Sequence, residues 1–442
     1  MSFRRCVIVI CDSLRADLVG DGTPVLQDLA RHGVRFDAVR AVFPSTTRVS
    51  SACIATGCHP ERHGLLGNTM ILDEPSGLVA RSAGAAGFRT QLHATTGRHL
   101  KVPTLAQRLA DQYSAAIYSN VSAGAAYFFD PDGFGYVYHR AGSYGPGMRP
   151  LDGSEGLDVQ PGADGDAEMT RRFCSRLQSD NALALAVLWL SEPDSSGHAR
   201  ALGSMEHRDA IGHAERCVAQ VRNIVTRLRE QGEDVLLMVG SDHGMESVVR
   251  EIDIAERLVE AGLKESPESR DIVVAPNGTA AVLGYVDEYP HRERLLAWLA
   301  QQDWVGDLTA GVDLKQWGLP DEPGCRVGIS LAASSTPNAH GVPGSACYAI
   351  DPANRKSYLG HGQHGGRNPH ERHPFLVIDG GDFPEGETVA QPISLTDYAP
   401  TVLYHLGLPW DGTQGSPLQK LLLACRQRET NFEDSHESTR TC

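Results

Sequence analysis

The sequence predicts an α/β fold: a doubly wound, mostly parallel central sheet with helices on both faces and an inserted smaller α+β cap. Two observations support this prediction. Short apolar runs alternate along the chain with segments of helical periodicity, which is the pattern of a parallel sheet covered by helices. The stretch at 255–355 departs from this alternation, because it holds short strand-like runs and its own helical segment at 292–301.

Four apolar runs are the expected strands of the central sheet. They lie at 7–11, 183–190, 235–239 and 375–378, and each consists mainly of aliphatic residues. A strand that is buried on both faces has such a continuous apolar run, since helices cover the sheet on either side.

Three segments carry the signals of helices that cover this sheet. Thr23 and Pro24 suit a helix start and Gly33 a helix end, with apolar residues at helical spacing between them. The segment at 206–231 repeats its apolar residues at the same spacing. The segment at 397–407 shows a similar start and stop near the end of the chain.

The chain is expected to form one core with an insertion. We assign residues 1–254 and 356–425 to the core, residues 255–355 to the inserted cap, and the polar residues 426–442 to a disordered tail. A stretch at 120–166 is rich in Gly, Tyr, Asp and Pro, which indicates long loops near a site.

Composition argues against several classes of protein. The 442-residue chain has a net charge of −15, so we expect no nucleic-acid polymer as a partner. We also expect no membrane span, because no apolar stretch reaches about 18 residues, and the run before Asp12 is short for a signal peptide. The ten cysteines lack zinc-finger spacing and indicate buried thiols in a reducing cytoplasm. The oligomeric state is not fixed by the sequence, and a dimer is one option.

Residue types that bind metals lie just beyond the predicted strands. Three of the four runs end in residues of this kind, and His364 precedes two glycines and then the fourth run. The set consists of Asp12, Asp194, His198, Asp242, His243 and His364. Because the carboxyl ends of parallel strands meet at one edge of a sheet, we expect these side chains to share a metal centre there.

The chemistry of this set indicates the kind of metal. Imidazole nitrogens and carboxylate oxygens are the ligands of catalytic zinc, which keeps a coordination position open. Six protein ligands suit two divalent ions and leave room for a nucleophile and a substrate oxygen. Two such ions can stabilise the attacking and the leaving oxygens of an in-line phosphoryl displacement.

Several short motifs occur in an order that matches a known family. They include a segment rich in hydroxyl side chains, at 43–57, and the sequence Ser-Asp-His-Gly. The matching motifs lie at 11–17, 43–47, 56–64, 192–198, 241–244 and 363–365. On these motifs the chain resembles the alkaline phosphatase superfamily, in its branch of type I phosphodiesterases and nucleotide pyrophosphatases, and it is also similar to phosphonoacetate hydrolase.

The resemblance implies two metal sites with different tasks. One ion would activate the hydroxyl of Thr47, which falls at the family's nucleophile, and the other would activate the hydrolytic water. The implied ligands are Asp12, Thr47, Asp242 and His243 for the first ion, and Asp194, His198 and His364 for the second. Because the superfamily also includes manganese-dependent mutases, manganese is the alternative to zinc.

Some implied roles have rivals in the sequence. The amide of Asn68, with the backbone N–H of Thr47, would donate hydrogen bonds to a phosphoryl oxygen. Thr46 is the rival hydroxyl for the role of nucleophile. His361 is the rival of His364, since a glycine follows it as well.

Two features of this region differ from what the family would suggest. After Thr47 the chain reads Arg-Val-Ser-Ser at 48–51, where the branch often reads Phe-Pro-Asn-His, so the wall of the phosphoryl pocket is not defined by the resemblance. Cys58 begins a Cys-x-Pro-x-Arg match to sulfatases, but it lies after Thr56, whereas their modified cysteine lies nine residues before the corresponding threonine. We therefore interpret the Cys58 match as accidental.

The predicted function is hydrolysis of a small phosphorus-containing substrate. Cleavage of phosphodiester or nucleotide pyrophosphate bonds through a phosphothreonine intermediate is the first choice. Hydrolysis of a carbon–phosphorus bond is an alternative that needs a cation such as Arg98 or Lys101 for a substrate carboxylate. A phosphomonoesterase and a non-catalytic metal-binding protein are the others. The aromatic side chains at 127–136 fit either a leaving-group pocket or ordinary packing.

Overall fold

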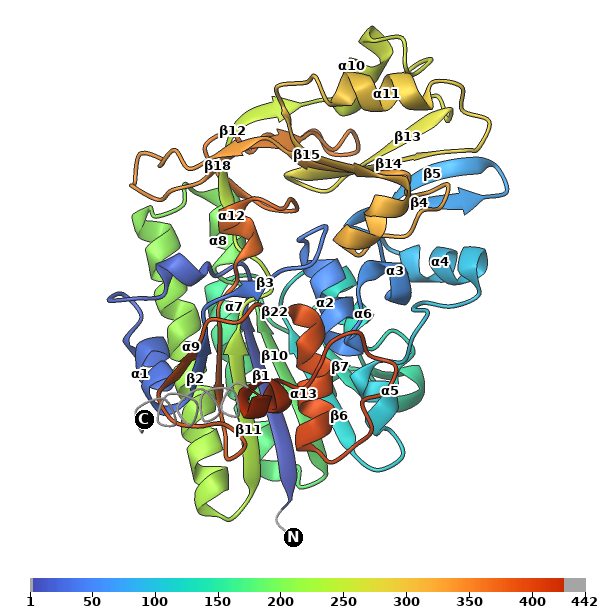
Figure 1. Ribbon diagram of the computed structural model, residues 1–442. Helices are drawn as coiled ribbons and strands as arrows, with labels where there is room; N and C mark the ends of the chain where they lie inside the picture. The colour runs from blue at the N-terminus through green and yellow to red at the C-terminus, as the bar shows by residue number, and fades with distance from the viewer. Residues whose placement is uncertain (1–2, 425–442) are drawn as a thin grey trace, which may run out of the picture.

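The computed structural model, which describes residues 3–424, has a ten-stranded sheet at its centre (Figure 1). Neighbouring strands of this sheet come from distant parts of the chain. Their order is β21 (Glu387–Val389), β2 (Val34–Phe36), β20 (Leu376–Asp379), β11 (Asp234–Gly240), β1 (Arg4–Cys11), β10 (Leu183–Leu190), β6 (Ser114–Ser119), β7 (Tyr136–Tyr138), β8 (Ser143–Gly145) and β9 (Arg149–Leu151).

The middle of this sheet is parallel. Strands β11, β1, β10, β6 and β7 pair in parallel, whereas β20 runs antiparallel to β11 and β8 runs antiparallel to β7. Successive side chains of β1 point to opposite faces, so Ile8 and Ile10 join one buried cluster while Val7 and Val9 join another. The predicted mostly parallel sheet with two covered faces is confirmed.

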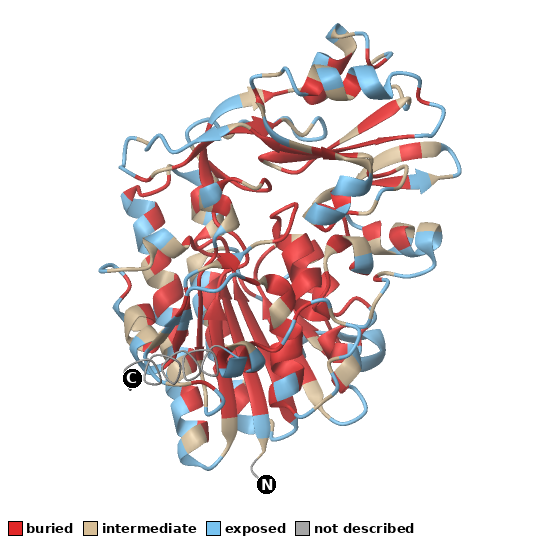
Figure 2. Ribbon diagram, in the orientation of Figure 1, coloured by how far each residue is buried: buried red, intermediate tan, exposed pale blue. Residues whose placement is uncertain are grey.

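Helices form a layer on each face of the sheet. One layer consists of α1 (Pro24–His32), α7 (Ala163–Ser179) and α9 (Met205–Glu230), and the opposite layer of α2 (Thr47–Thr56), α5 (Leu105–Leu109), α6 (Ala123–Phe129) and α13 (Tyr398–His405) (Figure 1). Helices α1, α9 and α13 match the segments predicted from helical spacing, with α9 beginning one residue earlier than its predicted segment. Buried residues concentrate in the central strands and in the helix faces turned toward them (Figure 2).

Two smaller sheets lie beyond the carboxyl ends of the central strands, at the top of Figure 1. One is an antiparallel sheet that packs with α10 (Ile254–Glu260) and α11 (Arg292–Leu299), and consists of β13 (Ile272–Pro276), β14 (Ala280–Tyr285), β16 (Val327–Leu331) and β15 (Val305–Ala310). The other has the strand order β17 (Ala333–Ser334), β18 (Ser345–Ala349), β12 (Glu246–Ile252) and β19 (Gly362–Gln363).

The second of these sheets joins the predicted cap to segments outside it. Strands β12 and β19 lie before and after the range 255–355, and β12 pairs with both β18 and β19. The exact division between core and cap therefore stays a prediction.

Shorter elements complete the fold. They are α3 (Pro60–His63), α4 (Phe88–Thr96), α8 (Asp194–Ala199), α12 (Pro369–Arg372), the pair β3 (Val39–Arg40) and β22 (Ile393–Ser394), and the hairpin β4 (Thr69–Glu74) and β5 (Gly77–Ser82).

Three predictions concern the chain as a whole. Between residues 3 and 424, no helix combines the length and the apolar character needed to cross a membrane. The eight cysteines of this part are free and buried, while the cytoplasmic location stays a prediction. The predicted disordered tail, 426–442, lies outside the described residues.

Candidate active site

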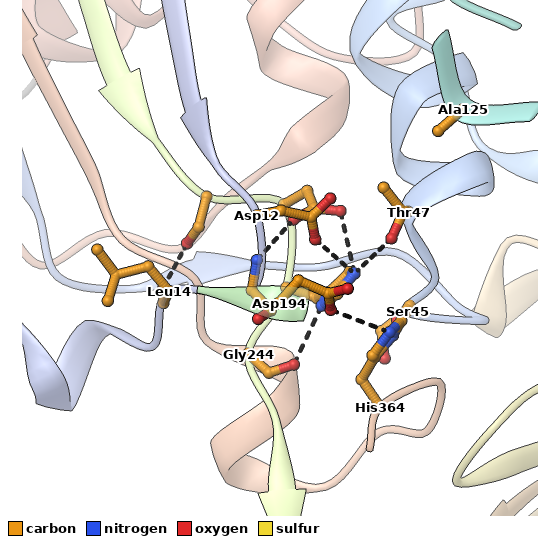
Figure 3. Close-up of polar contacts among 12 residues, drawn as sticks. Asp12, Leu14, Ser45, Thr47, Ala125, Asp194, Gly244 and His364 are labelled. Carbon is orange, nitrogen blue, oxygen red and sulfur yellow. Dashed lines mark hydrogen bonds and ion pairs between the residues drawn. The ribbon is translucent and has the colours of Figure 1, made fainter. Parts of the chain in front are cut away.

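Three adjacent parallel strands bring the predicted ligands to one edge of the sheet. Asp12 directly follows β1, and Asp242 and His243 follow β11 after one intervening serine. Asp194 begins α8 a few residues after β10, and His198 lies one helical turn further along that helix. His364 directly follows β19, and Figure 3 shows its ring beside the carboxylate of Asp194. The fold thus brings all six predicted ligands together.

The first group of ligands, which we call the inner cluster, consists of Asp12, Asp242 and His243. The Nε2 atom of His243 lies 3.1 Å from Oδ2 of Asp242 and 3.6 Å from Oδ1 of Asp12. All three side chains are buried, and these two carboxylate oxygens accept no hydrogen bond from the described residues. Burial, together with the charges of Asp242 and Asp194, raises the pKa of Asp12 well above its usual range. A bound cation would relieve this repulsion.

The second group, which we call the outer cluster, consists of Asp194, His198 and His364. The Oδ1 atom of Asp194 lies 3.3 Å from Nε2 of His198 and 3.6 Å from Nε2 of His364. This oxygen is buried and has no hydrogen-bond partner in the described part of the chain. The ring of His364 stacks on that of His243 at 3.7 Å, so the two clusters adjoin.

The three imidazoles are oriented by backbone carbonyls. The Nδ1 atoms of His198, His243 and His364 lie 3.0, 3.1 and 2.8 Å from the carbonyl oxygens of Gly362, Gly244 and Ser45. If Nδ1 carries the proton and donates it to the carbonyl, each Nε2 is left with a free lone pair directed at the carboxylates. This arrangement is typical of histidine ligands to a metal, so the residues present fit two divalent ions.

The surroundings shift the proton affinities of two of these rings in opposite directions. Burial lowers the pKa of His364 well below its usual value, and the neighbouring rings of His243 and His198 lower it further. Burial is the largest single influence on His243 and lowers its pKa, but the carboxylates of Asp242 and Asp194 and the carbonyl of Gly244 together outweigh it and raise that pKa. A histidine must be unprotonated to bind a metal, and the lowered pKa of His364 favours that state.

Thr47 lies at the start of α2 with its side chain directed at the inner cluster (Figure 3). Its Oγ1 atom is 3.2 Å from Nε2 of His243. Because the first N–H groups of a helix have no partners within it, this end of α2 favours a negatively charged group. The hydroxyl of Thr46, the N-cap residue, is buried and makes no hydrogen bond with the described residues.

A cavity of about 240 Å³ opens beside the outer cluster. Its wall includes Thr46, Asn68, His198 and His364, together with side chains that no sequence motif marked. Those unmarked side chains are Thr69, Ser82, Asn277, Tyr348, Asp351, Asn354 and Tyr358, and the wall also includes Arg48 and Gln363. Several belong to segments far apart in the sequence, so only their packing in the fold brings them to this wall.

Asn68 and Asn277 lie together on this wall. The side-chain amide of Asn277 bonds both backbone groups of Thr69, accepting from its N–H at 3.1 Å and donating to its carbonyl at 2.9 Å. Asn277 therefore fixes the backbone next to Asn68. The Oδ1 atom of Asn68, an acceptor, is buried without a hydrogen-bond partner among residues 3–424. Its Nδ2 group, which would donate to a phosphoryl oxygen, makes no hydrogen bond with those residues either.

The rival candidates lie elsewhere. Arg98 and Lys101 are exposed and neither lines the cavity, and Lys101 lies 4.0 Å from the carboxylate of Glu322. His361 belongs to neither group of ligand atoms that lie within 4.8 Å of one another in the described chain. His198 is also outside these groups, but its Nε2 lies 3.3 Å from Oδ1 of Asp194, and no such contact joins His361 to the ligands. Phe128 and Phe129 of the aromatic segment are fully buried in hydrophobic clusters, which favours packing over a leaving-group pocket.

The fold and this site are of the alkaline phosphatase type. Residues 6–366 match the model of the type I phosphodiesterase / nucleotide pyrophosphatase family. The chain belongs to this family, as its motifs predicted.

Known proteins of this family are similar to the chain over different lengths. Ectonucleotide pyrophosphatase/phosphodiesterase family member 7 of Mus musculus is 26% identical over 254 residues, which cover 55% of this chain and 50% of that protein. The chain thus spans about half the length of the curated relative it matches.

Solved structures show the same fold. Murine ectonucleotide pyrophosphatase/phosphodiesterase 5, as an inactive threonine-to-alanine variant in complex with AMP, has a TM-score of 0.65 at 17% identity and covers 95% of this chain and 99% of that one. The human protein of the same name has a TM-score of 0.64 at 15% identity, with coverages of 93% and 97%.

Proposed function

We propose that this protein hydrolyses phosphodiester or nucleotide pyrophosphate bonds with two divalent metal ions and Thr47 as the nucleophile. The observation that carries the proposal is the placement of a threonine hydroxyl 3.2 Å from a ligand of the inner cluster, at the start of a helix. The family of the chain supports the reaction class.

The metal-binding residues divide as the two clusters do. Asp12, Asp242 and His243 would hold one ion, and the outer cluster would hold the other. When bound, such ions lower the pKa of a coordinated hydroxyl or water and offset negative charge on the phosphoryl oxygens. Mixed nitrogen and oxygen ligands favour zinc, with manganese as the alternative.

The chain's own residues account for the covalent steps. The Oγ1 atom of Thr47 gives up its proton to solvent and attacks phosphorus. The bond from phosphorus to the leaving oxygen breaks, that oxygen leaves with the electron pair and takes up a proton from solvent, and the phosphoryl group is left on Thr47. Water then attacks that phosphorus, the bond to Thr47 breaks, and Oγ1 regains a proton. The free N–H groups at the start of α2 and the amide of Asn68 stabilise the oxygens on which charge develops.

Comparison with known structures supports this choice of nucleophile and substrate class. The murine structure combines an inactive threonine-to-alanine variant with a nucleotide, AMP. In this chain the hydroxyl of Thr47 also lies beside a candidate metal ligand, His243. A cavity large enough for part of a nucleotide lies beside the outer cluster.

A substrate panel tests the proposal. The zinc-loaded and the manganese-loaded protein would be assayed with a nitrophenyl phosphodiester, a nitrophenyl monoester, a dinucleotide pyrophosphate and phosphonoacetate. We expect the highest kcat/KM on the diester or the dinucleotide. Preference for the monoester or for phosphonoacetate would replace the proposed reaction, and hydrolysis of none of the four would reject it.

A further inference from the structure

Arg48 brings a half-buried positive charge to the wall of the cavity. It follows Thr47 in α2 and lines the same cavity as Asn68 and His364. Two edges of its guanidinium are occupied by protein: Nε donates to Oγ of Ser122 at 3.2 Å, and Nη1 donates to the carbonyl oxygen of Asn68 at 3.0 Å. Within residues 3–424, its Nη2 atom has no hydrogen-bond partner.

Two glycines, Gly84 and Gly124, leave space for the side chain of Arg48. A Cβ atom added to Gly84 would lie 2.2 Å from Nη2 of Arg48, and one added to Gly124 would lie 2.8 Å from its Nε. Neither glycine has a backbone conformation that requires glycine. The absence of a side chain at both positions therefore allows the guanidinium to lie in a narrow slot between them.

Among the described residues, Arg48 has no counter-charge. Its guanidinium is protonated at neutral pH, as arginine side chains in proteins are. No carboxylate of the described residues forms an ion pair with it, whereas the buried Arg5 and Arg15 are paired with Glu233 and Asp17. A half-buried cation without a carboxylate partner, on the wall of a cavity, is suited to a bound anion.

The acidic residue on the same wall does not supply that partner. Asp351 uses its carboxylate within its own turn, where it accepts hydrogen bonds from the backbone of Ala353 and the side chain of Asn354. The cavity thus offers one anchored cation with an open donor edge next to the predicted nucleophile.

We propose that Arg48 binds a second anionic group of the substrate, adjacent to the phosphorus that Thr47 attacks. This inference rests on the proposed function and narrows its substrate class. The substrates would carry a charged neighbour on the reacting phosphoryl group, as the second phosphate of a pyrophosphate does, and not two neutral ester groups. The dianion of a monoester and the carboxylate of phosphonoacetate share this chemistry, and the assay below separates them.

The alternative role for Arg48 is structural. Its bonds to Ser122 and to the carbonyl of Asn68 join α2 to α6 and to the segment before β4. A residue that only joins segments would affect every substrate to the same degree when replaced. A residue that binds an anion would affect anionic substrates selectively.

The test compares substrates across variants of Arg48. Kinetics would be measured for the wild-type protein and for Arg48→Gln, Arg48→Lys and Gly84→Ala on a dinucleotide pyrophosphate, a nitrophenyl monoester, phosphonoacetate and a bis-nitrophenyl diester. We expect Arg48→Gln to lower kcat/KM at least about tenfold more on the pyrophosphate than on the diester, because a hydrogen bond to a charged group is lost. Arg48→Lys should restore part of the selectivity.

Gly84→Ala provides a second route to the same result, because it displaces the guanidinium without removing it. We expect it to reproduce the selective loss in a folded protein, as checked by thermal unfolding. Arg89→Gln is the matched control, since Arg89 lies over the ring of Tyr127 and does not line the cavity. It should change no substrate preference.

The outcomes separate the two proposals. If the largest selective loss falls on the monoester or on phosphonoacetate, Arg48 still binds the second anion and the source of that anion is corrected. If Arg48→Gln lowers kcat/KM equally on all four substrates, the role of Arg48 in anion binding is rejected while the proposed hydrolysis stands. If the wild-type protein cleaves none of them, the proposed function itself fails.

Discussion

The inner and outer clusters use the same residue types in different surroundings. Asp12, Asp242 and His243 are at most 1% exposed, and the sheet delivers them at the ends of adjacent strands. In the outer cluster, by contrast, the side chains of His198 and Asp194 are 24% and 18% exposed. Their partner, His364, comes from a segment much later in the chain and lines the open cavity.

This difference in burial predicts that the two ions differ in affinity and in rate of exchange. The inner cluster is preorganised by the sheet, so an ion there should bind tightly and exchange slowly. The outer cluster depends on packing between α8 and the segment after β19, where His198 is tied to Gly362. An ion there should exchange more readily, as suits the side of the site that faces substrate and water.

Replacing Asp242 by Asn should have the largest effect and would break the inner cluster. We expect the loss of one ion per chain and a fall in kcat/KM of about 1000-fold or more, because charge stabilisation at the reacting group is lost. Metal analysis and steady-state kinetics measure these two effects. Asp28→Asn, at an exposed ion pair on α1, is the control and should change neither.

His63 is a buried histidine that, unlike His243, has no carboxylate beside it, and it should make the protein less stable in acid. Burial lowers the pKa of His63 to about 3, and its Nδ1 accepts a hydrogen bond from the N–H of Leu65 at 3.1 Å. In the unfolded chain His63 takes up a proton near its ordinary pKa of 6.5, whereas in the folded protein it stays neutral down to about pH 3. Its contribution to the free energy of unfolding is therefore complete above pH 6.5 and is lost as the pH falls from 6.5 toward 3. We expect protonation of His63 in the unfolded chain to lower the free energy of unfolding by up to about 3 kcal/mol between pH 6.5 and 4.

Denaturant unfolding at several pH values measures this effect. In His63→Gln the acid-side slope should become shallower, whereas His32→Gln, at an exposed position, should leave it unchanged. An unchanged slope in His63→Gln would contradict the interpretation of His63 as a neutral buried imidazole.

Replacing His198 by Ala should weaken the outer cluster alone. We expect about 100-fold weaker binding of one ion, since a direct ligand is lost, while the other ion is retained. Competition with a chelator should then show one ion leaving at lower chelator concentration than in the wild-type protein. Equal weakening of both ions would show that the clusters are not independent.

Trp189→Phe should have the smallest effect, on the inner cluster. The indole Nε1 donates to Oδ2 of Asp12 at 2.9 Å and so orients this carboxylate. Loss of that bond should weaken the inner ion about tenfold, because residues that orient a ligand contribute less than the ligand does. The same chelator titration measures this weakening. An effect as large as that of His198→Ala would show that Trp189 contributes as much to metal binding as a direct ligand.

The sequence predicts the inner cluster better than the wall of the cavity, for a physical reason. Asp12 and Asp242 lie directly beyond apolar runs, and parallel strands bring their ends together by necessity. Asn277 and Tyr358 reach the cavity only through packing of the smaller sheets, which no local pattern records. Arg48 was visible only as a departure from the family's motif, and its slot between Gly84 and Gly124 requires the fold.

The most direct test of the account compares Thr47→Ala with Thr46→Ala. Both variants and the wild-type protein would be analysed for metal content and for turnover of the best substrate of the panel. We predict two ions per chain in all three, turnover reduced at least about 1000-fold in Thr47→Ala, and turnover within about tenfold of wild type in Thr46→Ala. Near-normal turnover by Thr47→Ala, or fewer than two ions in the wild-type protein, would contradict the central claim.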